Sequence, residues 1–395
     1  MYTINPTLDS SGLIKHITKE FKVAITNHAS AKSYLNHINY SRLYPYLLRL
    51  SVVEPGINFS KVIKYYDLDR KLKLLAMDGI ERIEISFKAL FLSELVLSTK
   101  DEVWYANTLN YHNSEAFHHS CVMFFQYISG YKDLFLHNYL SNKYLTFNQE
   151  IWDGVVNCYT KQVFLLKQYL KDLKKIREEN HQIAENNKIH RTSLPLNHLP
   201  LIPKVKYKDI FKKCSPDVIL YLTSELLTIP KPYSHITSDV NDLLHKHSDI
   251  DITSLLSFLL YSLKIPFYLI VESLILGQLS NFFPRLAVGY RQMISNKIKS
   301  RLPVDNVNNH LEGFCKLRNI IAHHDRLFND NKLIKIDNFD KLTNFNSRTA
   351  KAYFDLIKYY LDIIAPNNTF EKKLNFLTNR YVSTYNICLY HWGFH

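Results

Sequence analysis

The sequence predicts an all-α protein, and three observations support this prediction. Only 9 glycines occur among 395 residues, too few for a β-rich fold with many tight turns. Long stretches place apolar residues three or four positions apart, as in helices with one buried face. Hydrophobic residues make up 46% of the chain and charged residues 22%, an ordinary globular composition. A chain of this length can bury a substantial core and is expected to form two or three domains.

The N-terminal half is expected to be helical throughout. The clearest helix covers residues 69–97, because Leu72, Leu75, Gly79, Ile83, Phe87 and Leu90 line one face and Asp67 or Asp69 can cap the start. Before it, a leader helix is expected over residues 13–25. A second helix is expected over residues 34–49, which Pro45 should kink or restart. After it, residues 104–169 keep an aromatic-rich helical pattern, with Asp101 or Asn113 as plausible helix starts.

The best boundary in the chain is the segment 191–203, where three prolines interrupt the pattern. It predicts an N-terminal helical region over 1–175, a charged and proline-rich connector over 176–205, and a helical domain over 206–395. Helices of this last domain are expected up to residue 227 and then over 251–263, 267–278, 286–299, from 307 onwards, and over 347–364.

Compartment and membrane signals are weak. The apolar stretch 255–279 is interrupted by Lys264, Pro266 and Glu272, which favours two buried helices over a membrane span. Five cysteines without a CxxC pair indicate thiols in a reducing compartment. The N-terminus lacks the pattern of a secretory signal. A cytoplasmic protein without membrane contact is expected.

The net charge of +13 favours a polyanionic partner such as RNA. Two basic clusters and three further residues are candidate RNA contacts: Lys204, Lys206, Lys208, Lys212 and Lys213; Arg291, Lys297, Lys299 and Arg301; and Arg42, Tyr44 and Arg326. Solvated helix ends explain the clusters equally well. A tyrosine-rich core seam with a solvated arginine explains Arg42 and Tyr44.

The densest set of catalysis-capable side chains lies in residues 315–328, CKLRNIIAHHDRLF. On a helical wheel, Arg318 falls within the arc of apolar residues, where a charge is costly unless it is paired or faces a partner. Asn319 and His323 are four residues apart and share the neighbouring edge. His324 points elsewhere.

These side chains suit RNA cleavage without a metal. Histidine moves protons near neutral pH, and the arginine fork matches a phosphate during attack by the 2′-OH. Two proton transfers are required, so a second copy across a two-fold axis would supply the missing partner. A structural Arg318 with two ordinary histidines remains the simpler alternative. A metal phosphohydrolase built on His324 and Asp325 lacks further ligands upstream.

The segment Arg318 to His323 resembles the Arg-x4-6-His signature of HEPN ribonucleases. More of the chain resembles the Abi-like (AbiD/AbiF) abortive-infection family. The resembling pieces occur in the family's order: INYSRLYPYLL, YYDLDRKLKLLAMDGIERIEISFKALFLSEL, IPFYLIVESLILGQLSNFF and CKLRNIIAHHDRLFN.

This resemblance implies a HEPN-type helical bundle with an additional N-terminal helical region. It also implies a metal-independent, cofactor-free endoribonuclease that acts as a toxin in phage defence and is restrained by a small non-coding RNA. The candidate catalytic residues are then Arg318, His323, Asn319 and His324, in a homodimeric or otherwise composite site. A non-catalytic module that holds a guide or antitoxin RNA is the alternative.

Overall fold

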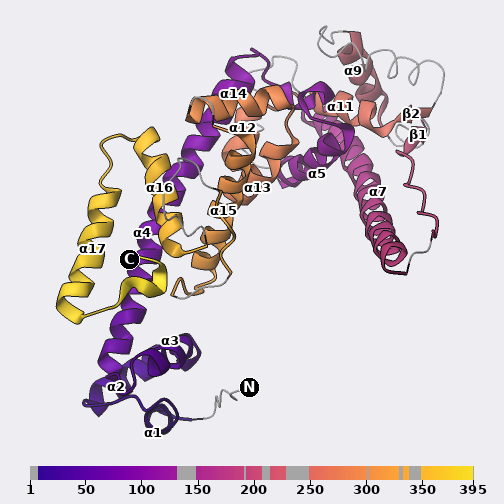
Figure 1. Cartoon of the computed structure of the whole chain (residues 1–395). Helices are drawn as coiled ribbons and strands as arrows, with labels where there is room; N and C mark the ends of the chain where they lie inside the picture. The colour runs from indigo at the N-terminus through magenta and orange to yellow at the C-terminus, as the bar shows by residue number, and fades with distance from the viewer. Residues whose placement is uncertain are drawn as a thin grey trace. The chain divides into compact units, whose positions relative to one another are not determined.

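The chain is all-α apart from one short sheet in the described residues of the computed structural model (Figure 1). The described residues are 8–130, 148–190, 193–206, 214–227, 249–299, 302–328, 332–337 and 348–394. The chain divides into two compact units. The terminal unit combines residues 1–86 with 305–395, and the central unit comprises residues 87–304. The predicted fold class is confirmed.

This division differs from the three consecutive segments expected from the sequence (1–175, 176–205 and 206–395). The proline-rich segment was the strongest boundary signal in the sequence, yet it lies inside the central unit. The first and last parts of the chain instead share one core, because α4 packs against helices from the C-terminal third. Such packing leaves no local mark on the sequence.

The terminal unit is built from seven helices and a short 3-10 turn among its described residues. They are α1 (Ser10–Phe21), α2 (His28–His37), α3 (Tyr40–Val53), α4 (Phe59–Phe91), α15 (Val304–Ala322), α16 (Ala350–Ile364), α17 (Phe370–Tyr385) and η6 (Leu389–Trp392). Helix α4 continues past the end of the unit at Ser86.

Helix α4 begins ten residues before the predicted start at Asp69. The side chain of Asn58 accepts a hydrogen bond from the Ser60 amide at 2.9 Å, as an N-cap residue does. Asp67 and Asp69 therefore lie inside the helix, and the prediction that either caps it is wrong. The fully buried Asp69 instead bonds residues from other parts of the chain.

Helix α3 runs through Pro45 without interruption, so the expected restart does not occur. Proline lacks an N–H and cannot donate to the carbonyl oxygen of Ser41, which would be its helical acceptor. Burial of Leu43, Tyr46 and Leu47 on one face keeps the segment helical. Tertiary packing therefore outweighs the local cost of proline.

Helices α16 and α17 lie alongside α4 (Figure 1). Gly79 of α4 makes this approach possible, because a Cβ atom there would lie 2.5 Å from Cγ2 of Ile357. Tyr381 of α17 donates a hydrogen bond to Asp67 at 2.6 Å. Helix α16 matches the predicted helix 347–364 closely, whereas α17 and η6 were missed as an undefined tail.

The central unit contains one helix of 42 residues and a series of shorter elements. In its described residues these are the π-helical segment η1 (Leu92–Leu97), η2 (Trp104–Ala106), η3 (Thr108–Asn110), α5 (Ser114–Gly130), α7 (Gln149–His190), α9 (Pro216–Leu227), α11 (Ile252–Leu263), α12 (Phe267–Ser273), α13 (Leu276–Phe282), η5 (Phe283–Arg285) and α14 (Val288–Ile298).

The only sheet among the described residues pairs β1 (Lys204–Lys206) with β2 (Asp249–Asp251). The strands are antiparallel, with Val205 opposite Ile250. Lys204–Lys206 are thus extended, and the next helix among the described residues, α9, begins at Pro216 and ends at Leu227, where the sequence predicts a helix end.

Helix α11 confirms the sequence expectation almost to the residue. Asp251 caps it by accepting a hydrogen bond from the Thr253 amide at 2.6 Å, and Lys264 ends it in the left-handed conformation at φ 52°. The expected helix 267–278 is two helices, because the chain is extended at Leu274 and Ile275. Across the described ranges, no single helix is long and apolar enough to cross a membrane. The bent pair α11 and α12, at 98°, passes that test on length and composition alone.

Helix α7 extends through the first part of the expected connector. Beyond Leu173 its residues are largely exposed, and the proline-containing segment 193–203 runs back along it. Two asparagines hold this segment through their side-chain amides. Asn180 bonds the backbone of Asn197 in both directions, and Asn187 does the same with Leu194, at 2.6–3.0 Å.

Candidate functional site

The candidate site surrounds the turn that ends α15. The amide of Asp325 donates to the carbonyl of Ile320, and the amide of His324 donates to that of Ile321, both at 2.9 Å. This pair of bonds is a Schellman motif, which places the residue after the cap in the left-handed region. His324 occupies that position at φ 57°, where glycine is usual. His323 and His324 thus point in different directions from a sharply bent backbone.

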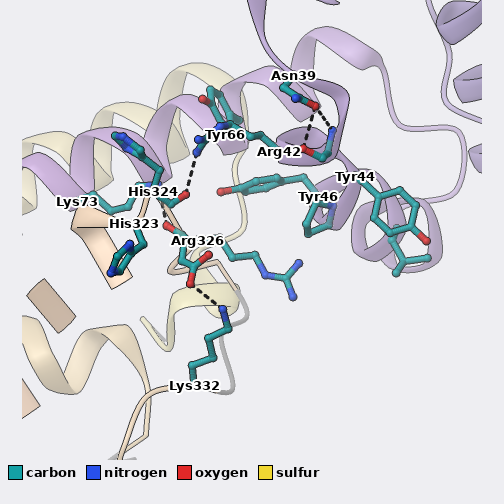
Figure 2. A pocket seen from close by; sticks show the side chains of 14 residues that line it. Asn39, Arg42, Tyr44, Tyr46, Tyr66, Lys73, His323, His324, Arg326 and Lys332 are labelled. Carbon is teal, nitrogen blue, oxygen red and sulfur yellow. Dashed lines mark hydrogen bonds and ion pairs between the residues drawn. The ribbon is translucent and has the colours of Figure 1, made fainter. Parts of the chain in front are cut away.

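Two cationic side chains hold the exposed carbonyls of this turn. Arg42 of α3 donates from Nη1 to the carbonyl of His324 at 3.2 Å, and Lys73 of α4 donates to that of Asp325 at 3.0 Å (Figure 2). Lys73 also forms an ion pair with the buried Asp69 at 3.3 Å. The turn is therefore fixed to two N-terminal helices that lie more than 200 residues away in the sequence.

Asp69 anchors the residues that follow the turn. Its carboxylate accepts from the amides of Leu327 (3.1 Å) and Phe328 (2.8 Å), which continue the turn into the core. It also accepts from the Tyr46 hydroxyl and the Trp392 indole N–H, each at 2.8 Å. Burial raises the pKa of Tyr46 well above its usual value, and the neighbouring Asp69 raises it further. Tyr46 therefore remains a neutral donor to this carboxylate.

A cavity of 570 Å³ opens beside the turn (Figure 2). The first half of α3, two residues of α4 and the turn itself supply its lining. The lining residues are Asn39, Ser41, Arg42, Tyr44, Pro45, Tyr46, Leu48, Tyr66, Lys73, His323, His324, Asp325, Arg326 and Lys332.

The cavity is strongly cationic. Arg42, Lys73, Arg326 and Lys332 line it, against the single carboxylate of Asp325. Lys332 bonds that carboxylate at 2.7 Å and holds its pKa below the usual range, with smaller contributions from His323 and Lys73. Such a cavity favours an anionic ligand next to two imidazoles.

Arg318 and Asn319 do not line this cavity. Arg318 is half-buried on α15, and in the described residues its guanidinium makes no hydrogen bond or ion pair. Burial raises the pKa of the neighbouring Cys315 thiol, and the charge of Arg318 opposes that rise. In the part of the chain that the structure describes, no hydrogen bond joins Arg318 to His323. A single chain therefore presents the two motif residues on different sides of the helix end.

The other predicted RNA contacts separate into two groups. Arg42, Tyr44 and Arg326 meet at the cavity with His323 and His324. The remaining candidates belong to the central unit. Lys204 is exposed on β1, and Lys297 pairs with Glu94 at 3.6 Å at the end of α14.

Arg291 is half-buried on α14, and its Nε atom is buried without a hydrogen-bond partner in the described residues. Lys299 is exposed at the C-cap of the same helix. Lys208, Lys212, Lys213, Arg301 and the side chain of Lys206 lie outside the described residues.

Sequence reasoning missed Lys73, Lys332, Tyr66 and Asp69 at this site. An aspartate on the apolar face of a helix pattern, four residues before a lysine, was the available signal for Asp69 and Lys73. Lys332 and Tyr66 carry no such signal. Among the residues that the structure describes, no group of three or more histidines, cysteines or carboxylates is arranged to hold a metal ion.

Fold and site together define an all-α protein with a cationic cavity beside an Arg-x4-His helix end. The chain matches the model of the Abi-like protein family over residues 33–202 and 208–329, and it belongs to that family. The match includes α3, α4 and α15, the three helices around the cavity. Neither the curated proteins nor the solved structures include a match to this chain.

Proposed function

We propose that this protein is a metal-independent endoribonuclease that acts as a toxin in phage defence. Membership of the Abi-like protein family supports the coarser part of this proposal, a role in abortive infection. The Arg318 to His323 motif at the end of α15, next to a cationic cavity, carries the finer part.

The reaction would cleave RNA by attack of a 2′-OH on the adjacent phosphorus. One imidazole takes the proton of the 2′-OH, and a second acid returns a proton to the departing 5′-oxygen. A guanidinium stabilises the charge that develops on the phosphate oxygens. His323 is exposed beside the cavity and is suited to the proton transfer, while Arg318 supplies the permanent cation.

The second proton-transfer group would come from another copy of the chain. Arg318 is half-buried without a hydrogen-bond partner in the described residues. A half-buried charge is stabilised when a facing surface supplies a partner for it. A two-fold pairing of α15 ends would set Arg318 of each copy against His323 of the other. A small non-coding RNA bound to the basic surface is proposed as the restraint on cleavage.

The test is cleavage of RNA by purified protein in excess chelator. His323→Ala and Arg318→Ala should each abolish cleavage and cellular toxicity, with helical content unchanged. His37→Ala and Arg380→Ala are matched controls, because both residues are exposed helix residues of the same unit outside the site. Undiminished cleavage by His323→Ala would refute the proposal. Tight, salt-sensitive RNA binding without cleavage by the unmodified protein would favour the non-catalytic RNA-binding module instead.

Mixing the unmodified chain with the His323→Ala chain tests the composite site. If each site takes one imidazole from each copy, a mixed dimer lacks one of the two proton-transfer groups and cannot cleave. Cleavage should then fall with the square of the fraction of unmodified chain. A fall that is linear in that fraction would reject this arrangement.

A further inference from the structure

We infer that the cavity beside His323 and His324 is a pocket for one unstacked nucleotide of single-stranded RNA. This inference rests on the proposed function, and it identifies the part of the substrate that the site holds. Four features of the cavity support it: its volume, its charge, the guanidinium of Arg326, which makes no hydrogen bond or ion pair in the described residues, and its partly exposed tyrosines.

The volume suits a ligand of nucleotide size. At 570 Å³ the cavity falls within the range of about 300–1,000 Å³ that is usual for small-ligand pockets. A base pair within a duplex cannot enter such a space, because its bases remain stacked and paired. The occupant is therefore a base that has left the stack of a single strand, together with its sugar and phosphate.

The charge of the lining specifies an anion. Positive side chains outnumber negative ones by three among the lining residues, without counting the histidines. Lys73 is committed to Asp69 and to the turn carbonyl, and Lys332 is bonded to Asp325. These two ammonium groups therefore attract an anionic ligand mainly through their positive electrostatic potential, and less through a direct hydrogen bond.

Arg326 is the side chain best placed to bind the phosphate. In the described residues its guanidinium makes no hydrogen bond or ion pair, although it lies close enough to Tyr46 to oppose the rise of that residue's pKa. Figure 2 shows its side chain extending away from the turn, on the side where Tyr44 and Tyr46 lie. A guanidinium can bind two phosphate oxygens at once. Arg326 follows His323 by three residues in the sequence, so a phosphate bound by Arg326 is close to the histidine proposed to transfer the proton.

Tyrosines supply surfaces for a base. Tyr44 and Tyr66 are partly exposed and line the cavity. The hydroxyl of Tyr46 is occupied by Asp69, and its ring packs edge-on to that of Tyr66 with centroids 5.9 Å apart. Base stacking on aromatic rings tolerates any sequence, because every base has a π-face. The pocket would therefore select for single strands more than for a particular base.

The inference is tested with the Arg318→Ala chain, which cannot cleave under the proposed function but retains every cavity residue. Binding of a fluorescein-labelled single-stranded RNA is measured by anisotropy over a range of salt concentrations. Arg326→Gln in this background should weaken binding about tenfold and reduce the log–log salt slope by about 1. Tyr66→Ala should weaken binding about tenfold with the slope unchanged. Arg380→Gln, outside the cavity, is the charge-matched control and should leave binding unchanged.

Competition identifies the ligand. Each nucleoside 3′-monophosphate should displace the labelled RNA at high concentration, while a blunt duplex of the same sequence should not compete. Unchanged affinity in both Arg326→Gln and Tyr66→Ala would overturn the inference. So would a duplex that competes as well as the single strand, because the cavity would then be a phosphate patch. Binding lost in these variants while Arg318→Ala still cleaves would refute the proposed function and leave the pocket standing.

Discussion

Replacing Asp69 with asparagine should destabilise the terminal unit by about 3–5 kcal/mol, the usual cost of breaking a buried charge pair. Asp69 is fully buried, and donors from four separate segments converge on its carboxylate. These donors are the Tyr46 hydroxyl, the Lys73 ammonium, the amides of Leu327 and Phe328, and the Trp392 indole. Every one of them requires an acceptor, and a carboxylate accepts at both oxygens.

An asparagine can satisfy only one side of this arrangement. If its oxygen takes the place of Oδ1, it still accepts from Phe328 and Trp392. Its NH2 group then faces Lys73, whose side chain is only 12% exposed and loses its counter-ion. The reverse orientation leaves the Phe328 amide and the indole without an acceptor. Hydrogen bonds to a charged acceptor contribute about 1.5–3 kcal/mol each, so losing two of them costs about 3–6 kcal/mol, which overlaps the loss of about 3–5 kcal/mol expected above.

Thermal and urea unfolding, followed by circular dichroism, measure the loss. A change of 3–5 kcal/mol lowers Tm by about 6–20 °C in a fold of this size. Asp67→Asn is the matched control, because Asp67 lies two residues away but its side chain is 29% exposed, and its change should cost about 1 kcal/mol or less. Trp392→Phe removes one donor to this carboxylate and should cost about 1.5–3 kcal/mol from the hydrogen bond. A Tm for Asp69→Asn within 2 °C of the unmodified protein, or equal to that of Asp67→Asn, would refute this reasoning.

Three further changes follow from particular residues. His324→Gly should raise the free energy of unfolding by about 0.5–1 kcal/mol, because glycine adopts φ 57° without strain. The urea midpoint should rise accordingly, and an unchanged midpoint would contradict this. Burial lowers the pKa of His310 to about 4, so the folded state keeps it neutral while the unfolded chain protonates below about 6.5. Stability should therefore fall by about 3 kcal/mol between pH 6.5 and 4, and His310→Gln should flatten that part of the profile; equal slopes would exclude His310 as the cause. The Cys158 and Cys214 sulfurs lie 3.0 Å apart, so diamide should link them into a disulfide that mass spectrometry detects and that adds about 4 kcal/mol by loop closure; Cys158→Ser should abolish both effects.

Local signals in the sequence predicted the fold class and several helices accurately. Helix α11 has both a cap at Asp251 and an apolar face, and its bounds came out almost as predicted. The predicted start of α4 was wrong, because an aspartate before an apolar run gives the same sequence pattern whether it caps a helix or lies inside one. Only the tertiary donors around Asp69 distinguish the two cases, and they come from residues 46, 327, 328 and 392.

The candidate site shows the same limit. Arg42, Tyr44, Arg326, His323 and His324 were each singled out from the sequence, but nothing in their spacing placed them around one cavity. A helical wheel relates residues of one helix only. The contact of Arg42 with the carbonyl of His324 spans 282 residues, and it depends on how α3 packs beside the end of α15.

The separation of Arg318 from His323 bears on how a complete site can form. Five residues along a helix correspond to a rotation of about 140°, so two such side chains cannot lie on one face. His323 borders the cavity, and Arg318 does not. If the cavity holds a nucleotide beside His323 and the protein cleaves RNA as proposed, two arginines are candidates to stabilise the phosphate during cleavage: Arg326 in the same chain and Arg318 of a second copy. Arg326 is close enough to bind the ground state, whereas Arg318 would approach only on assembly. Binding and cleavage would then depend on different arginines, which is the distinction that the Arg326→Gln and Arg318→Ala variants resolve.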